Sequence, residues 1–456
     1  MRTIIKNGTI VTAQEVFQAD LLIEGEKIVS ISQKIIPDLD DRIIDASGQY
    51  VFPGGIDVHT HLANTEKNDF ESGTIAAAAG GTTCVINMTT PEIGQSVTAY
   101  LEDWKEKSAE SVIDYSNHFI ISGTGYNDDI LDEIPVLAEQ GITSLKIFMA
   151  YKGQTMINDP EIYKVMKKAA ELDLTVAIHA ENGDIIEEMI NEHVEQGKTD
   201  PIYHAKTRPP EMEAEAVARA AAIAEVTGAK IYIVHLSCDA ALKEAIHAKQ
   251  RGIDITVETC PQYLVLDEEY LTLPDFEGGK YVCSPPLRER WNQESLWRGI
   301  RDGVITVVGS DHCSYDFQGQ KTIGRRNFAE IPNGVPGIED RFLIVYQSGV
   351  VEGRISLQKF VEIMCTKPAE VFGLSSKGSI SVGKDADLVL LDPNRERTIT
   401  KEHQKQANDY NLYEGMKVNG SITHVFSRGE MIVRAGEFTG TKKRGRFIKR
   451  TAKAGI

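Results

Sequence analysis

Residues 51–62 read VFPGGIDVHTHL, and this stretch marks the point where the character of the chain changes. Before it, from Arg2 to about Gly48, short β-rich runs are punctuated by Asn-Gly and Gly-Glu turn signals, which predicts a small antiparallel sheet. After it, brief apolar runs alternate with helical stretches such as Asp103–Ser111 and Glu211–Thr227. The stretch therefore opens a second architecture, in which strands and helices alternate.

The alternation continues through the middle of the chain. Eight strand–helix repeats predict a closed (β/α)8 barrel, whose active site gathers at the carboxyl ends of the strands. The expected strands end near the following residues: His61, Met88, Ile121, Ala150, Ala180, Ser237, Cys260 and Asp311. Polar side chains at these positions are the first candidates for chemistry.

The chain is longer than a barrel requires. A barrel takes up to about 250 residues, whereas this chain has 456. The β-rich texture returns after about Gly373, and neither terminal segment is long enough for a well-stabilised sheet of its own. We therefore expect residues 1–50 and 376–456 to pair into one composite β-sandwich domain beside a catalytic barrel of residues 51–375.

The composition is that of a globular protein with an excess of acidic residues. Lys and Arg number 49 and Asp and Glu number 67, so the formal net charge is −18. This charge argues against a nucleic-acid or anionic-membrane partner, because both would repel the protein at long range. We also expect a cytoplasmic protein, because no secretory signal or transmembrane segment is visible and the six scattered cysteines show no disulfide or zinc-knuckle spacing.

One segment differs from this acidic background. Residues Lys442–Arg450 read KKRGRFIKR and are strongly basic. Such a segment is either a solvated tail or an arm that docks on an acidic neighbouring subunit. Both readings stay open at this stage.

Four of the 11 histidines lie where a barrel strand would reach its catalytic face. His59 and His61 stand two residues apart, so an extended strand places both side chains on one face. His179 and His235 are each the first strongly polar residue after an apolar run. Six others occur singly without a metal-like pattern and are expected to be surface or satisfied residues: His118, His193, His204, His247, His403 and His424.

Lys146, in SLKIFMAY, and Asp311, in VVGSDHC, fall at the same level of the expected barrel. A lysine within a strand is costly to bury as a cation unless it pairs with a carboxylate. Four histidines, one aspartate and one lysine are too many ligands for one tetrahedral zinc ion and suit two. The count works if the Lys146 amine has reacted with CO2 to give a carbamate, whose anionic oxygens can bridge two cations.

Motifs over essentially the whole chain resemble the hydantoinase and dihydropyrimidinase branch of the cyclic amidohydrolases. They are VFPGGIDVHTHL, DFESGTIAAAAGGTT, GITSLKIFMAYK, HAENGD, DPIYHAKTRPPE, VHLSC, ETCPQYL, SPPLR, GSDHC, IPNG with IEDR, and GKDADLVLLDP. The resemblance implies a binuclear zinc barrel with a composite β-sandwich, assembled as a homotetramer or dimer. It further implies hydrolysis of small cyclic ureides, such as 5-substituted hydantoins and dihydropyrimidines, to N-carbamoyl amino acids by a metal-bridging hydroxide.

The same resemblance assigns roles to nine residues. Tyr151 matches an oxyanion-stabilising tyrosine, and Ser284 and Asn333 match positions whose backbone groups hold the cyclic ureide. Asp311 is also expected to take the proton of the attacking hydroxide and pass it to the leaving nitrogen. Six residues are implied metal ligands: His59, His61 and Asp311 on the first ion, His179 and His235 on the second, and carboxylated Lys146 across both.

The loop after His61 departs from the relatives. Dihydroorotases carry an arginine where this chain has Ala63, which argues against dihydroorotate as a substrate. Family hydantoinases usually have an aspartate there and a longer, more apolar loop, whereas residues 61–70 read HLANTEKNDF. We expect a more open and less aromatic pocket that disfavours bulky aryl hydantoins, unless the loops after strands two and four supply the missing wall.

The cysteines and the histidine near the expected site are expected to have structural rather than catalytic roles. Adjacent residues at a strand end point in different directions, so Cys313 is expected to be structural rather than a nucleophile paired with His312. His312 could instead orient a ligand. Cys238 and Cys260 are expected to be packing residues.

Two other functions compete with this one. Some relatives are non-enzymatic cytoskeletal signalling proteins that keep the fold and lack the metal ligands, and the retention of all six ligand residues argues against that role. The other is an allantoinase, whose substrate is also a cyclic ureide. The strings ETCPQYL and SPPLR favour the hydantoinase side.

Overall fold

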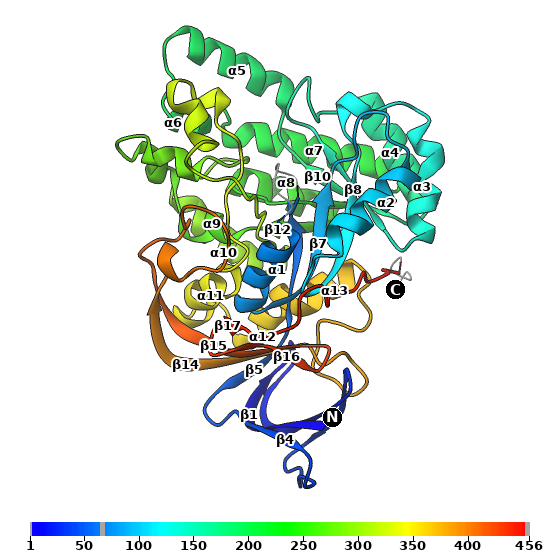
Figure 1. Cartoon of the computed structure of the whole chain (residues 1–456). Helices are drawn as coiled ribbons and strands as arrows, with labels where there is room; N and C mark the ends of the chain where they lie inside the picture. The colour runs from blue at the N-terminus through cyan, green and yellow to red at the C-terminus, as the bar shows by residue number, and fades with distance from the viewer. Residues whose placement is uncertain (1, 64–68, 452–456) are drawn as a thin grey trace.

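Eight parallel strands form a nearly closed barrel at the centre of the molecule (Figure 1). The computed structural model describes residues 2–63 and 69–451. The barrel strands are β6 (Gly55–Thr60), β7 (Thr82–Thr89), β8 (Asp114–Ile120), β9 (Ser144–Phe148), β10 (Thr175–His179), β11 (Lys230–Ile233), β12 (Ile255–Thr259) and β13 (Ile305–Val308). Each ends within four residues of its expected position, and the (β/α)8 prediction is confirmed.

The barrel closes where β6 meets β13. The Asp311 N–H donates a hydrogen bond to the His59 carbonyl at 2.9 Å. The His61 N–H donates to the His312 carbonyl, also at 2.9 Å. These two bonds join the first and last strands of the barrel at their carboxyl ends, where the active site is expected.

Helices cover the outside of the barrel, with at least one after each strand. Every residue of β7 is buried, which is typical of a parallel strand with both faces covered. The helices are α1 (Phe70–Ala79), α2 (Val97–Ser108), α3 (Ile130–Glu139), α4 (Asp159–Glu171), α5 (Gly183–Glu195), α6 (Ile202–Lys206), α7 (Pro210–Thr227), α8 (Asp239–Gln250), α9 (Pro261–Val265), α10 (Trp291–Arg301), α11 (Arg341–Val345), α12 (Leu357–Val361) and α13 (Lys367–Val371).

Local capping sets the ends of these helices. The helix expected over Asp103–Ser111 is shifted toward the amino terminus, because the Ser96 side chain accepts a hydrogen bond from the Ala99 N–H and so starts α2 earlier. The helix expected over Glu211–Thr227 is confirmed by α7, which begins one residue earlier. A proline starts α7, and Gly228 ends it in a left-handed conformation at φ 72°.

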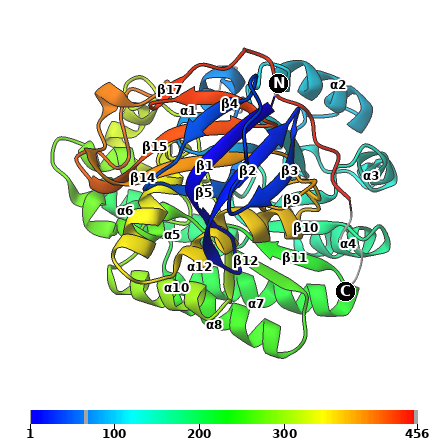
Figure 2. The ribbon, with the colours of Figure 1, turned by 90° about the horizontal axis from the view of Figure 1, so that it is seen from below.

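Strands from both termini form one nine-stranded sheet below the barrel in Figure 1. They are β1 (Arg2–Val11), β2 (Val16–Glu24), β3 (Lys27–Ser32), β4 (Arg42–Asp45), β5 (Tyr50–Pro53), β14 (Leu388–Thr398), β15 (Lys417–Ser427), β16 (Glu430–Arg434) and β17 (Glu437–Phe438). The two halves meet where β5 pairs antiparallel with β14, and Figure 2 shows the strands of the two termini side by side. The expected pairing of the termini is confirmed.

The sheet differs in one respect from the antiparallel arrangement expected for its amino-terminal half. β1 pairs parallel with β4 and β5, because the chain returns after β3 to the opposite edge of β1. Alternate residues of β14 face two cores: Leu388 and Leu390 pack in the core of the sheet, while Val389 and Leu391 pack against the barrel. The domain boundaries after residues 50 and 375 stay a prediction.

The basic segment Lys442–Arg450 packs on its own chain. Arg450 is only 3% exposed and donates to the Ser116 hydroxyl at 2.9 Å and to the Asn117 carbonyl. Four of the other five cations form ion pairs: Lys442–Glu71, Lys443–Glu110, Arg444–Glu430 and Arg446–Glu26. The segment is therefore not a solvated tail, and its contact with a neighbouring subunit stays a prediction.

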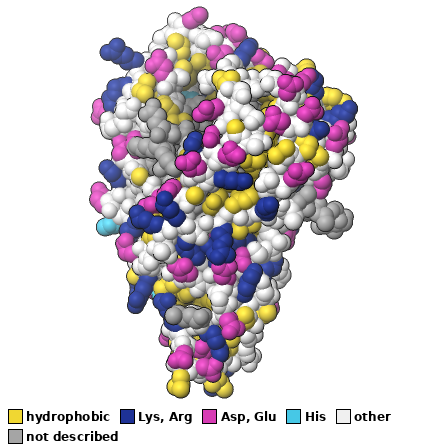
Figure 3. All heavy atoms as spheres, turned by 45° about the vertical axis from the view of Figure 1, so that its right-hand side comes forward, with side chains coloured by type: hydrophobic (Ala, Val, Ile, Leu, Met, Phe, Trp, Pro, Cys, Tyr) yellow, Lys and Arg dark blue, Asp and Glu magenta, His cyan; other side chains and the backbone are white. Residues whose placement is uncertain are grey.

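Charged side chains of both signs are mixed over the surface. On the face shown in Figure 3, acidic and basic side chains are interspersed, and neither sign covers the face continuously. In the part of the chain that the structure describes, no helix is both long enough and apolar enough to cross a membrane.

The buried end of the basic segment gives a stability prediction. Replacing Arg450 with alanine leaves a cavity and removes the donors to Ser116 and Asn117, so we expect a loss of roughly 2–3 kcal/mol in the free energy of unfolding. Thermal unfolding should show a midpoint lowered by several degrees. Lys443→Ala is the matched control, because its ammonium is exposed, and it should leave the midpoint nearly unchanged. Equal midpoints for the two variants would show that the segment contributes little to stability.

Candidate active site

His59 and His61 at the end of β6, together with Asp311 after β13, form the first cluster of polar side chains in the barrel mouth. His59 Nε2 lies 3.1 Å from Asp311 Oδ1, and His61 Nε2 lies 3.3 Å from the same oxygen. Burial raises the pKa of the Asp311 carboxyl, but the neighbouring His59, His61 and Lys146 lower it overall, so the group is a carboxylate. Three ligand atoms that converge in this way can hold a metal ion.

His179 and His235 form a second pair beside the first cluster. His179 Nδ1 lies 2.9 Å from His235 Nε2, and the rings of His235 and His59 stack with their centroids 5.4 Å apart. Burial lowers the pKa of both His179 and His235, which leaves each imidazole in the neutral form that binds metals. The structure thus brings together the four histidines that the sequence singled out from strands one, five and six.

Lys146 lies among these ligands, in the middle of β9. Its side chain is fully buried, and its Nζ has no hydrogen-bond partner in the described part of the chain. The Lys146 Nζ lies 4.7 Å from the centroid of the Phe148 ring. Burial lowers the pKa of Lys146 to about 7, so the amine loses its proton far more easily than an ordinary lysine. An unpartnered buried amine of this kind can act as a nucleophile.

Two glutamates outside the ligand set orient the histidines. His59 Nδ1 lies 2.7 Å from Glu258, whose second oxygen accepts from the Tyr232 hydroxyl at 2.7 Å. His179 Nε2 lies 2.7 Å from Glu181. A carboxylate on one ring nitrogen directs the other nitrogen toward a metal ion. Sequence reasoning missed both glutamates. The rule that found the histidines would have found Glu258, which is the first strongly polar residue after the strand run 255–257, but not Glu181, which comes two residues after His179.

Three residues of the site have a strained backbone conformation. Tyr151, His235 and Asp311 have φ angles of 66°, 41° and 53°, in the left-handed region that non-glycine residues rarely adopt. Such conformations persist only where the surrounding structure holds them, and they cluster at functional sites. The strain here coincides with three of the nine residues predicted from the sequence.

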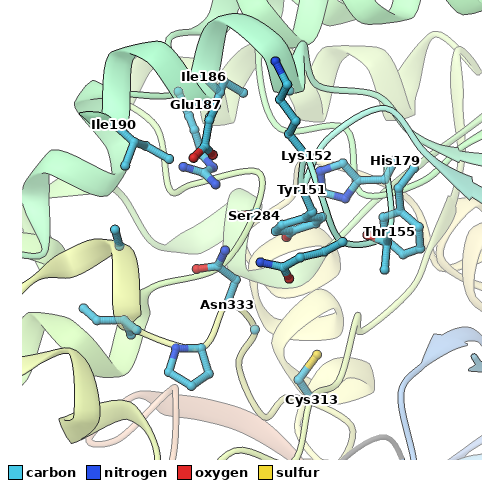
Figure 4. Close-up of a pocket in the computed structure, with 18 of the residues that line it drawn as sticks. Tyr151, Lys152, Thr155, His179, Ile186, Glu187, Ile190, Ser284, Cys313 and Asn333 are labelled. Carbon is cyan, nitrogen blue, oxygen red and sulfur yellow. The ribbon is translucent and has the colours of Figure 1, made fainter. Parts of the chain in front are cut away.

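All nine predicted residues line one cavity of about 670 Å³. Figure 4 shows Tyr151, Ser284 and Asn333 around the same space. Burial, with a contribution from the Glu181 carboxylate, raises the pKa of the Tyr151 phenol, so its hydroxyl stays a proton donor. In the described residues, no hydrogen bond engages the backbone N–H or carbonyl of Ser284 or of Asn333. These backbone groups are therefore available to a ligand.

The outer wall of the cavity comes mainly from α5 and the loop after β9. Ile186, Glu187 and Ile190 of α5 face Lys152 and Thr155 of that loop (Figure 4). The loop after the fourth strand thus supplies part of the wall, and it does so with polar side chains. None of the described lining residues comes from the loop after the second strand. Of the loop after His61, residues 64–68 lie outside the described residues.

The remaining histidines and cysteines behave largely as expected. His118 is buried, with Nε2 3.0 Å from the Val58 carbonyl, and is a satisfied residue of the barrel core. His312 Nδ1 accepts a hydrogen bond from the Gly337 N–H at 3.1 Å. The contact of His312 with His61 is made by its backbone carbonyl, which accepts from the His61 N–H. Cys313 lines the cavity, and burial raises the pKa of its thiol, which argues against a nucleophilic role. All six cysteines carry free thiols, and Cys238 and Cys260 are buried packing residues as expected.

A second acidic cluster lies at the other end of the barrel. Asp114, Asp385 and Asp387 bring their carboxylates together. The Lys377 ammonium sits among them, with its Nζ 2.5, 3.0 and 2.8 Å from the three carboxylates, and Arg428 Nε lies 3.0 Å from Asp114. Lys27 Nζ also lies 2.7 Å from Asp385, so three cations pair with the three carboxylates, and the cluster is an ion-pair network that ties the sheet to the barrel.

Comparisons with known proteins agree with this geometry. The Amidohydrolase family model matches residues 50–432. The chain is 49% identical to the D-hydantoinase of Geobacillus stearothermophilus over 99% of this chain and 97% of that protein, and 48% identical to the D-hydantoinase of Ralstonia pickettii over 99% of each.

Solved structures extend the similarity to the whole fold. The crystal structure of dihydropyrimidinase from Brevibacillus agri superposes with a TM-score of 0.96, at 47% identity and covering 100% of both chains. An L-hydantoinase from Arthrobacter aurescens superposes with a TM-score of 0.91 at 28% identity, over 98% of this chain and 99% of that one. The chain belongs to the amidohydrolase family, within its hydantoinase and dihydropyrimidinase group.

Proposed function

We propose that the protein hydrolyses the ring amide of cyclic ureides, including 5-substituted hydantoins and dihydropyrimidines, to N-carbamoyl amino acids. The observation that carries the proposal is the convergence of four histidines, Asp311 and the unpartnered Lys146 amine in one cavity. The names of the relatives point to the same reaction, since they are D-hydantoinases and dihydropyrimidinases. The protein would act as a cytoplasmic homotetramer or dimer.

The donor set fits two zinc ions. Imidazole and carboxylate are ligands that zinc accepts, and the chain offers them in two adjacent groups. When bound, two such ions lower the pKa of a shared water toward neutrality and polarise a carbonyl group. The proposed ligands are His59, His61 and Asp311 for one ion, His179 and His235 for the other, and carboxylated Lys146 for both.

Carboxylation of Lys146 accounts for its burial. The neutral amine would attack the carbon of CO2, forming an N–C bond, and lose a proton to leave a carbamate anion. The carbamate would replace a buried amine that has no partner with an anion that two metal ions can neutralise. This would remove the free-energy cost of burying an unpaired polar group. The low pKa of Lys146, about 7, supports the step because it increases the fraction of neutral amine.

The ureide ring would be held by backbone groups. A cyclic ureide presents N–H donors and carbonyl acceptors around a small planar ring. Ser284 and Asn333 line the cavity with free backbone donors and acceptors of the complementary kind. Binding through backbone groups leaves the substituent on the ring carbon directed toward the wall formed by α5 and the loop after β9.

Tyr151 and Asp311 would carry the proton and charge transfers. As water adds to the ring carbonyl, negative charge grows on its oxygen, and the protonated Tyr151 hydroxyl would donate a hydrogen bond to it. Asp311 would accept the proton of the attacking water and deliver it to the ring nitrogen as the carbon–nitrogen bond breaks. The products of this step are a carboxylate and a terminal ureido group on the same molecule.

The pocket wall bears on which substituents fit. Only Phe148, Tyr151 and Tyr315 are aromatic among the described lining residues, and Lys152, Gln154 and Thr155 of the loop after β9 are polar. We therefore propose that small or polar substituents are preferred over bulky aryl groups.

A substrate panel tests the function directly. Zinc-loaded protein should open hydantoin and dihydrouracil, with a lower kcat/KM for phenylhydantoin, and the products should be N-carbamoyl amino acids. A strong preference for phenylhydantoin would contradict the proposed preference for small or polar substituents, and turnover of allantoin alone would make the protein an allantoinase. Absence of turnover from a protein that also binds no zinc would favour the non-enzymatic scaffold.

Replacing Tyr151 with phenylalanine tests the oxyanion role. Loss of one donor to the developing charge should lower kcat by roughly 10²-fold, while zinc content stays at the wild-type level. Tyr163→Phe is the matched control, because Tyr163 is 41% exposed on α4 and should leave kcat unchanged. Near-normal turnover of Tyr151→Phe would remove Tyr151 from the mechanism.

Replacing Lys146 with alanine tests the bridging carbamate. We expect zinc content to fall well below about two ions per chain and activity to fall with it, because the ligand shared by both ions is gone. Short-chain carboxylates should restore part of both. Lys164→Ala, which removes an exposed lysine paired with Asp128, should retain metal and activity. A fully active Lys146→Ala protein would refute the carbamate.

A further inference from the structure

Lys321 is a fully buried lysine outside the metal cluster. It lies at the start of the 3₁₀ turn Lys321–Arg326, in the long loop after β13. No carboxylate pairs with it in the described part of the chain. Its Nζ donates instead to two backbone carbonyls, those of Val282 at 2.8 Å and Pro332 at 3.0 Å. Burial lowers the pKa of Lys321 to about 7.

The two carbonyls belong to the two segments that hold the proposed substrate groups. Val282 stands two residues before Ser284, and Pro332 stands immediately before Asn333. One direct bond also joins these segments, from the Gly334 N–H to the Val282 carbonyl at 3.1 Å. Lys321 therefore links the two segments by hydrogen bonds from outside the cavity. Figure 4 shows Ser284 and Asn333, one from each segment, at this cavity.

Other side chains hold only one of these segments. His204 Nε2 lies 2.8 Å from the Cys283 carbonyl, and the Tyr263 hydroxyl donates to the Pro285 carbonyl at 2.6 Å. The carbonyls on either side of Ser284 are thus fastened, while its own backbone groups stay free for a ligand. Neither His204 nor Tyr263 reaches the segment that carries Asn333, whereas Lys321 contacts both segments.

The cost of burial indicates that this contact is more than packing. An ammonium removed from water without a carboxylate partner destabilises the folded protein, and an apolar side chain would fill the same space at lower cost. Two carbonyl acceptors compensate for only part of this penalty. The geometry explains the retained lysine, because its single Nζ donates to two carbonyls on separate loops and can fix the distance between them.

We propose that Lys321 is a positioning residue for the substrate, setting the spacing between the backbone groups of Ser284 and Asn333 that hold the cyclic ureide. The inference rests on the proposed function. Lys321 does not line the cavity, so it acts through these two segments and not by touching the substrate. It would therefore affect ring binding more than the chemical step, and it would leave the metal ligands in place.

Lys321→Met, which keeps the length of the side chain and removes its donors, tests this role. We expect KM for hydantoin to rise about 10-fold or more while kcat changes less than about 3-fold, because the loss is one of binding. Zinc content should equal that of the wild type. Amide hydrogen exchange should become faster in residues 282–287 and 331–334 than in the barrel strands. Unchanged KM together with unchanged exchange would overturn the proposal.

Two controls make the outcome unambiguous. Lys280→Met removes a nearby ammonium that pairs with Glu277, and it should change neither KM nor exchange. Lys321→Gln retains an NH2 group with two donors but no charge, so it should restore part of the wild-type KM, and it replaces the methionine variant if that variant does not fold. If wild-type protein turns over no cyclic ureide, the proposed function fails. The exchange data then decide separately whether Lys321 holds the two segments.

Discussion

The hydrogen bond from the Asp311 N–H to the His59 carbonyl closes the barrel, and the arrangement of the site depends on it. β6 and β13 are the edges of the eight-stranded sheet, so their backbone groups would otherwise lack partners. The Asp57 carboxylate strengthens the closure by accepting from the N–H groups of His59 at 3.2 Å and Ser310 at 3.0 Å. Closure brings His59 and His61 from the first strand together with Asp311 after the last strand, in a group that could hold a metal ion.

Burial then determines the chemistry of the groups that closure brings together. Removal from water lowers the pKa of His179 and of His235, which favours their neutral forms, and it favours the neutral amine of Lys146. Glu181 responds differently: burial raises its pKa, but His179 and the Arg208 and Arg288 cations lower it to about 2. The same dry cavity therefore contains neutral donors for metal ions and fixed carboxylates that orient them.

Patterns local to one strand were predicted well, and contacts across the fold were not. The i, i+2 spacing of His59 and His61 and the ends of the apolar runs located the histidines that converge in the cavity, because strand geometry is a local property. The role of Glu258 in orienting a histidine was not predicted, because it depends on contact with His59, 199 residues away. Composition could not decide between a solvated tail and an intersubunit arm for the basic segment at the carboxyl terminus, because it does not show that Arg450 is buried against β8.

The sequence by itself determined the alternation of strands and helices in the barrel, the pairing of the two termini and the residue types available for chemistry. These follow from hydrophobic periodicity and side-chain type, which are properties of the sequence alone. Only the tertiary structure decided which of those residues meet. It placed nine candidates on one cavity, left Lys146 without a partner and linked the Ser284 and Asn333 segments through Lys321. The physical reason is that burial, desolvation and backbone-to-side-chain contacts arise between segments far apart in the chain, and no local pattern encodes them.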